Sequence, residues 1–220
     1  MFKPLQIKRS SRFGSSYWEV FSVKANRIIQ LFGDLQYDNW VLVESNPKIK
    51  SFCENPNVTN YVRYGKEREP FYDMWVQWDD FSEELIKVYR IKELSSTNNN
   101  FDNLKNIIKH QENWCIKKGY KFSVITENEI RNNTILLDNL KIIIAYTRNK
   151  SYAVEIDTRK IINAIQNGQN SIQSIEKYLL FLPTYKILEA FSWLIFSGII
   201  SSDIDIKPLN PNTKVWLKYD

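Results

Sequence analysis

The spacing of apolar residues in the first part of the chain predicts a helix. From residue 24 to residue 44, apolar side chains recur at nearly helical intervals, with Gly33 as a weak point inside the segment. Pro47 ends this pattern, because the residue before a proline disfavours helical geometry. We therefore expect a helix over about 24–44.

Three runs further along the chain are rich in β-branched and aromatic residues and are separated by turn-forming residues. They cover residues 58–64, 71–78 and 84–91. This composition is typical of strands, and the short connections between the runs favour an antiparallel meander.

The segment up to residue 148 predicts one more helix and one more strand. The elements are, in order, a polar loop over 95–100, a helix over 104–118 and a buried strand over 122–125. Gly119 is suited to close the helix in the left-handed conformation, and Thr126 with Glu129 forms a capping-box pattern. Together these elements predict an α/β fold class and a first domain over residues 1–150.

The last part of the chain predicts three helices followed by two strands. The helices are expected over 158–166, over 171–180 and from Pro183 to Gly198, and the strands over 199–206 and 214–217, joined by a turn at 208–211. This order is the winged-helix arrangement and defines a second domain over residues 151–220. Many winged helices present the third helix to DNA, whereas others bind only proteins.

The composition excludes several kinds of chemistry. The 220 residues include one histidine, two cysteines and six glycines. A single histidine cannot form a His-rich zinc site and argues against Ser-His or Cys-His nucleophiles. Cys53 and Cys115 form no CxxC pair, and no glycine-rich phosphate loop is present, so a reducing cytoplasm is expected and nucleotide-driven chemistry is not.

The charge of the chain permits a polyanionic partner. Thirty Lys and Arg residues against 25 Asp and Glu residues give a net charge of +5. The first twelve residues carry Lys3, Lys8, Arg9 and Arg12 with no apolar run after them, so they are no signal peptide. Such a basic arm either contacts phosphates or is a solvated tail.

The most apolar stretch, 187–200, is too short for a membrane span, so no membrane association is expected.

The order of the predicted elements also fits metal-dependent cleavage of phosphodiesters. Restriction-type nucleases place a glutamate on a helix, an aspartate on a strand and a Glu/Gln-x-Lys motif on the next strand. Carboxylates and water are the ligands that Mg²⁺ prefers, and a lysine stabilises the charge that develops during cleavage. A spacing of two on a strand puts both groups of the last motif on one face.

Six segments carry a more specific pattern in the same order. They are 20–28, with a Ser-x-Lys-x-x-Arg entry; 34–37 with 43–47; 51–56, SFCENP; 71–76, FYDMWV; 122–130 with 137–140; and 194–208. In this order they resemble the TnsA family, the endonuclease subunit of heteromeric transposases. The resemblance extends over nearly the whole chain and implies a restriction-endonuclease-like domain followed by a winged helix.

The resemblance implies an enzyme that uses Mg²⁺ to nick transposon ends together with a TnsB-like transposase and a TnsC-like ATPase. The family's helix glutamate corresponds to Gln36, its strand aspartate and metal ligand to Asp73, and its Glu/Gln-x-Lys motif to Lys87 and Tyr89. The residues expected to contact DNA are Lys8, Arg9, Arg12, Lys24 and Arg27.

These substitutions predict a degenerate nuclease site. Gln36 offers a neutral carbonyl, so Asp73 remains as the single mapped carboxylate, and Lys87 would compete with Mg²⁺ for it. Losing one electrostatic element typically costs about 10²–10³ in rate. A rescue that pairs Glu84 with Lys87 requires a bulge, since residues three apart on a regular strand face opposite sides. Asp34 and Asp38 flank Gln36 on other faces of the predicted helix.

Three functions stay open at the level of sequence. The first is a DNA- and partner-binding member of a recombination system with weakened or lost nuclease activity. The second is an active, Mg²⁺-dependent endonuclease with a rearranged site. The third is an adaptor or inhibitor that contacts only protein. Without the resemblance, Asp73 would be interpreted as an ordinary turn or ion-pair carboxylate.

Overall fold

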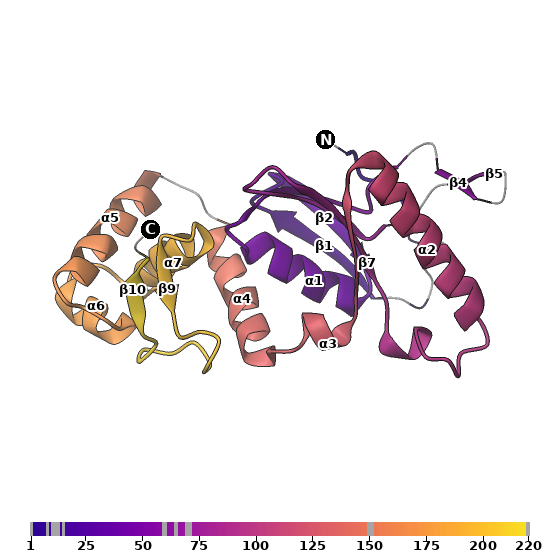
Figure 1. Ribbon diagram of the computed structural model, residues 1–220. Helices are drawn as coiled ribbons and strands as arrows, with labels where there is room; N and C mark the ends of the chain where they lie inside the picture. The colour runs from indigo at the N-terminus through magenta and orange to yellow at the C-terminus, as the bar shows by residue number, and fades with distance from the viewer. Residues whose placement is uncertain are drawn as a thin grey trace. The chain divides into compact units, whose positions relative to one another are not determined.

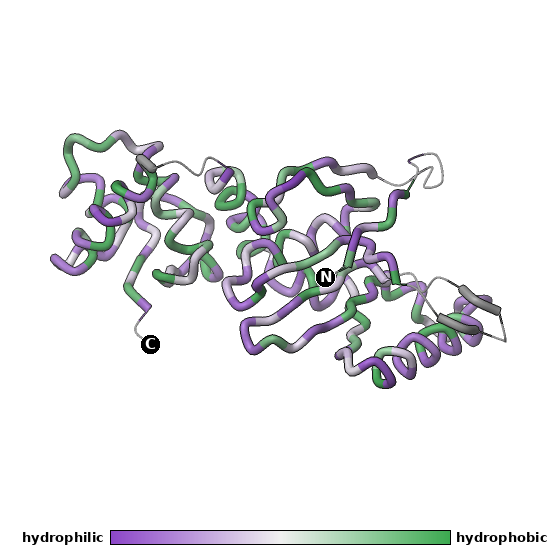
Figure 2. The backbone as a smooth tube through the Cα atoms, turned by 90° about the horizontal axis from the view of Figure 1, so that it is seen from above, coloured by the Kyte–Doolittle hydropathy of each residue, from purple (hydrophilic) through white to green (hydrophobic). Residues whose placement is uncertain are grey.

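The computed structural model describes residues 2–7, 9, 14, 16–58, 61–63, 66–68, 72–148 and 152–218. The chain forms two compact units. The first contains Met1–Val43 and Lys48–Asn132, and the second contains Glu44–Pro47 and Asn133–Asp220. Figure 1 labels their helices and strands, and Figure 2 shows hydrophobic and hydrophilic residues interleaved in short runs along the backbone.

The first unit begins with a β-hairpin where the sequence predicts a helix. Strands β1 (Tyr17–Ser22) and β2 (Arg27–Phe32) are antiparallel, and helix α1 covers only Asp34–Ser45. The predicted helix over 24–44 is therefore wrong for residues 24–33, which are nearly half of its length. Within β2, Ile29 and Leu31 are buried whereas Ile28 is 64% exposed, which is the two-residue alternation of a strand. Gly33, at a φ of +96°, separates the strand from the helix rather than weakening a helix.

A four-stranded mixed sheet forms the centre of this unit. Its strands are β3 (Ile49–Glu54), β6 (Met74–Trp78), β7 (Glu83–Val88) and β8 (Lys121–Ile125), in the order β3-β6-β7-β8. The first two pairings are antiparallel, and β8 lies parallel to β7 because helix α2 (Phe101–Lys118) forms the crossover. The mixed sheet and its helices give an α/β fold.

The predicted meander is correct for β6 and β7 but starts from the wrong strand. The strand beside β6 is β3, whose register shifts between Ile49 and Ser51, and this irregularity hides its alternation in the sequence. Among the described residues of the predicted run 58–64, Tyr61–Arg63 form β4, which pairs with β5 (Lys66–Arg68) in a separate ribbon.

The helix ends of the first unit follow the expected capping chemistry. Gly119 closes α2 at a φ of +79°, and its N–H donates to the carbonyls of Cys115 and Ile116. A short 3-10 helix, η2 (Ile91–Glu93), follows β7, and α3 (Glu127–Ile130) follows β8. The Thr126 and Glu129 side chains form the predicted capping box at α3.

The described residues of the second unit form four helices and a hairpin. They are α4 (Thr134–Thr147), α5 (Tyr152–Gln166), α6 (Ile172–Tyr178), α7 (Thr184–Phe196), β9 (Ile200–Ser202) and β10 (Val215–Leu217). The three helices and the antiparallel hairpin predicted after residue 151 are present, with shorter strands. Helix α4 packs against α7 and belongs to this unit, whereas the predicted division assigned residues up to 150 to the first domain.

No helix in the described part of the chain is both long enough and apolar enough to cross a bilayer.

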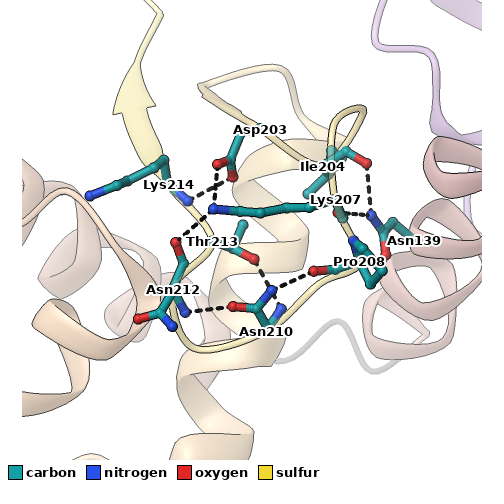
Figure 3. Close-up of polar contacts among 9 residues, drawn as sticks. All are labelled: Asn139, Asp203, Ile204, Lys207, Pro208, Asn210, Asn212, Thr213 and Lys214. Atoms are coloured by element: carbon teal, nitrogen blue, oxygen red, sulfur yellow. Dashed lines mark hydrogen bonds and ion pairs between the residues drawn. The ribbon is translucent and has the colours of Figure 1, made fainter.

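A buried asparagine orders the connection between β9 and β10. Asn139 on α4 donates to the carbonyls of Ile204 at 2.7 Å and Lys207 at 2.8 Å, and it accepts from the N–H of Leu209 at 2.8 Å. Figure 3 shows this side chain and the neighbouring contacts of the loop. The connection is therefore a fixed structure, because its backbone groups have defined partners.

Replacing Asn139 with alanine should lower the free energy of unfolding by about 2–4 kcal/mol, since three backbone groups lose their partner. Urea denaturation followed by circular dichroism measures this change. The matched control is Asn212→Ala, which removes an exposed side chain from the same loop and should change stability by less than about 0.5 kcal/mol. Equal effects of the two substitutions would contradict the role given to Asn139.

Candidate functional site

Asp73 is a buried carboxylate at the start of β6, with three donors around it. Its Oδ2 atom lies 2.9 Å from the Lys87 ammonium and accepts from the N–H of Val88 at 2.7 Å. Its Oδ1 atom accepts from the Gln36 carboxamide. Only 4% of the Asp73 side chain is exposed, so the carboxylate is surrounded by donors from the protein itself.

Gln36 lies in the first turn of α1 and links the end of β2 to Asp73. Its Oε1 atom accepts from the N–H of Phe32 at 3.0 Å, which directs its Nε2 atom towards the carboxylate. The left-handed conformation of Gly33 turns the chain between Phe32 and α1 and permits this contact. Both polar atoms of the Gln36 carboxamide are therefore used within the protein.

Lys87 lies on β7 and Tyr89 directly follows this strand, and their spacing of two brings both side chains to the same side. The Lys87 side chain is 12% exposed, and its ammonium lies 5.3 Å from the centre of the Tyr89 ring. The N–H of Tyr89 donates to the carbonyl of Ile125 on β8 at 3.0 Å. The ring stabilises the buried ammonium by a cation–π interaction in addition to its ion pair with Asp73.

The four residues mapped to nuclease positions line one cavity of about 230 Å³. The other lining residues are Phe32, Gly33, Leu35, Val88, Arg90 and Glu93. Arg90 and Glu93 were not among the predicted site residues, although their place directly after Lys87-x-Tyr89 was the available signal. Glu93 accepts from the N–H of Arg90 at 2.7 Å and so helps to shape this end of the cavity.

The donor set of the cavity does not fit Mg²⁺. Two carboxylates and two basic side chains line it, so their formal charges cancel, whereas a divalent cation requires an excess of negative charge. Three protein donors occupy the Asp73 carboxylate, and Gln36 uses its carbonyl oxygen on Phe32. Among the described residues, no group of three or more His, Cys, Asp or Glu side chains has a metal-site arrangement.

The acids considered for a rearranged site have other partners. The pairing of β7 with β8 continues without interruption from Glu84 to Val88, so no bulge brings Glu84 onto the face of Lys87. Glu84 accepts from Trp78 Nε1 at 2.9 Å and from the hydroxyl of Ser123. Asp38 pairs with Arg131, and Asp34 accepts from Trp18 Nε1 at 3.2 Å.

The five residues expected to contact DNA have different environments. Lys8 and Arg12 lie outside the described residues. Arg9 is exposed, and its guanidinium lies 4.9 Å from the centre of the Tyr17 ring. Lys24 donates to the carbonyl of Val43 at 3.0 Å, in the last turn of α1.

Arg27 forms a two-pronged ion pair with the buried Glu54 carboxylate. Its hydrogen bonds to Glu54 raise the pKa of Arg27. Lys24 and Arg27 therefore have structural contacts within the first unit, and Arg9 is the described member of the set that presents an exposed cation.

The two thiols are unsuited to nucleophilic chemistry. Burial raises the pKa of Cys53 to about 12 and the pKa of Cys115 to about 11. The Cys115 sulfur also lies 3.2 Å from the Tyr72 hydroxyl, inside the core between the sheet and α2. Both side chains act as small apolar residues of the core.

The chain matches no protein-family model and has no significant match among curated proteins.

Replacing Lys87 with methionine should lower the free energy of unfolding by roughly 3–5 kcal/mol, because it leaves the buried Asp73 carboxylate without a counter-charge. Adding Asp73→Asn should recover part of this loss, and chemical denaturation of the single and double variants measures the coupling. Lys141→Met breaks an exposed pair with Asp138 and should cost at most about 1 kcal/mol. Strictly additive effects at positions 73 and 87 would contradict the ion pair.

The native protein should be inert to aromatic disulfide reagents at a pH near 8. That pH lies below the pKa of both thiols, so each remains protonated and the reactive thiolate is scarce. Absorbance of the released aryl thiolate should show no fast phase for the folded chain and two equivalents after denaturation in guanidinium. Rapid modification of either cysteine in the folded protein would disprove this assignment.

Proposed function

We propose that this chain is a DNA-binding protein with a nuclease-type pocket that no longer cleaves. We further propose that it is a TnsA-like component of a transposition or recombination system, which acts by binding DNA and partner proteins. A TnsB-like transposase and a TnsC-like ATPase are the partners that this assignment implies.

The ion pair between Lys87 and Asp73 is the observation that carries the proposal. In a metal-dependent nuclease the aspartate holds a cation that polarises the scissile phosphate. Here the Lys87 ammonium lies 2.9 Å from the same carboxylate and is itself largely buried. A fixed monovalent cation at this place neutralises Asp73 and keeps a divalent ion from it.

The convergence of the mapped positions supports the nuclease origin of the pocket. Gln36, Asp73 and the Lys87-x-Tyr89 pair come from one helix and two neighbouring strands, and all of them line one cavity. This is the element pattern of a helix acid, a strand acid and a two-residue motif on the next strand. It favours a restriction-endonuclease-like first unit, and the three helices with a hairpin favour a winged helix in the second.

The pocket can still receive a phosphodiester without cutting it. Arg90 and Lys87 supply cationic groups beside the cavity, and the mixed charges of its lining impose no strong repulsion on a phosphate. Tyr89 occupies the position of the lysine that would stabilise the transition state. Its side chain is uncharged, so it gives little stabilisation to the negative charge that develops there. The geometry therefore fits retention of DNA at the site with loss of the chemical step.

An exposed apolar patch supports the partner-binding part of the proposal. Around the connection between α6 and α7, Leu180 is 78% exposed and Phe181 is fully exposed, with Tyr178 and Tyr185 about half exposed. Four large apolar side chains exposed within eight residues are a feature of protein-interaction surfaces. The same patch is the observation that favours the adaptor alternative.

A supercoiled-plasmid assay with Mg²⁺ or Mn²⁺ tests the loss of cleavage. The native protein should bind the plasmid yet nick it no faster than the Asp73→Ala variant. The combined substitution Gln36→Glu, Lys87→Gln and Tyr89→Lys restores the mapped groups and should raise Mn²⁺-dependent nicking by about a hundredfold or more. Robust cleavage by the native protein that Asp73→Ala abolishes would overturn the proposal.

A further inference from the structure

The central helix of the second unit is covered along most of its length. Helix α7 packs against both α4 and α5, and its residues after Tyr185 are buried or half-buried. Its lysine, Lys186, is paired with Glu189 at 2.7 Å. A helix that enters the major groove needs an exposed face with side chains that reach the bases. Helix α7 lacks such a face, so it is not the DNA-contacting element of this unit.

Strand β10 and the residues beside it present a different surface. Lys214, Trp216 and Lys218 are exposed, whereas Val215 between them is buried and Leu217 is half-buried. Because side chains alternate along a strand, the three exposed side chains share one face. The two lysines are about 13 Å apart along the strand. Trp216 lies between them and is 48% exposed. A large exposed aromatic ring between two cations is therefore fixed on one strand.

The charge on this face is positive. Neither Lys214 nor Lys218 forms an ion pair through its side chain with another described residue. The carboxylate of Asp203, which directly follows β9, lies 2.9 Å from the Lys207 ammonium and also accepts from the backbone N–H of Lys214 at 2.7 Å. Lys207 therefore pairs with Asp203, and the two exposed lysines give this face an excess of positive side chains.

The hairpin is also held rigidly. Asn139 fixes one side of the connection between its strands, and Asn210 with Thr213 fixes the other through a 2.9 Å hydrogen bond. Figure 3 shows the Lys214 side chain extending away from this network, so its ammonium remains available. A surface that is already ordered loses little conformational entropy when it binds.

We propose that the row Lys214, Trp216 and Lys218 binds an unpaired DNA strand, with one base stacked on Trp216 and backbone phosphates on the two lysines. Aromatic platforms between basic side chains are the chemistry that recognises single strands, since every base has a stacking face. The proposal rests on the proposed DNA-binding function and names the element and the form of DNA in the second unit. Duplex DNA offers no free base face to a half-exposed ring.

Fluorescence anisotropy of the full chain with a labelled oligothymidine strand, and with a duplex of equal length, tests this inference. Trp216→Ala should weaken binding of the single strand about tenfold, whereas Trp216→Phe, which keeps a stacking ring, should retain most of the affinity. Replacing Lys214 and Lys218 with alanine should lower the slope of log affinity against log salt by about 1.4, since each lysine accounts for about 0.7 on a single strand.

The matched controls come from the same unit. Ile156 on α5 is 42% exposed, close to the 48% of Trp216, and Arg159 on the same helix is exposed. Ile156→Ala and Arg159→Ala should leave the affinity and the salt slope unchanged. All these positions are on the surface, so thermal melting should confirm that each variant folds as the native chain does.

The outcomes separate this inference from the proposed function. If the native chain binds DNA and the hairpin variants bind as tightly as the controls, the hairpin inference is wrong and DNA binding stands. Loss of duplex and single-strand binding to the same extent in the hairpin variants would contradict the preference for an unpaired strand. A native chain that binds neither form of DNA would overturn the proposed function together with the inference.

Discussion

The buried ion pair between Asp73 and Lys87 is the interaction on which the candidate site depends. It joins the neighbouring strands β6 and β7, and the Gln36 carboxamide extends it to α1 and the end of β2. The Asp73 carboxylate and the Lys87 ammonium neutralise each other, because an unpaired charge is costly to bury in the protein interior. The same contact that connects these elements also takes the position at which a nuclease would hold its metal ion. Structural cohesion and the proposed loss of cleavage thus share one physical cause.

The proposed function acts through surfaces rather than through a reaction. The pocket of the first unit is lined by two cationic side chains and two carboxylates, and this balance of charge is the basis for proposing contact with a phosphodiester without its hydrolysis. In the second unit, α7 is enclosed by α4 and α5, so the terminal hairpin and the connection between α6 and α7 present the groups available to partners. One of these surfaces is basic and aromatic, and the other is apolar.

The sequence predicts the elements whose signals are local and misses those set by distant contacts. The Gly119 and Thr126 caps, helices α2 and α7 and the pairing of β6 with β7 follow from short-range chemistry. Strand β2 was mistaken for the start of a helix because Ile28, Leu31 and Phe32 fall at helical spacing. Residues Gln36, Asp73, Lys87 and Tyr89 were found through resemblance, and the structure brings them together. Arg90 and Glu93 join them only through the fold of the chain after β7.

Binding of Mn²⁺, followed by electron paramagnetic resonance of the free ion, measures whether Lys87 excludes a divalent cation from Asp73. The native protein and the Asp73→Asn variant should bind Mn²⁺ equally weakly, because the Lys87 ammonium already neutralises this carboxylate. The variant Lys87→Gln, which removes the competing cation, should be the one that gains affinity. A tight site in the native protein that disappears in Asp73→Asn would contradict the account.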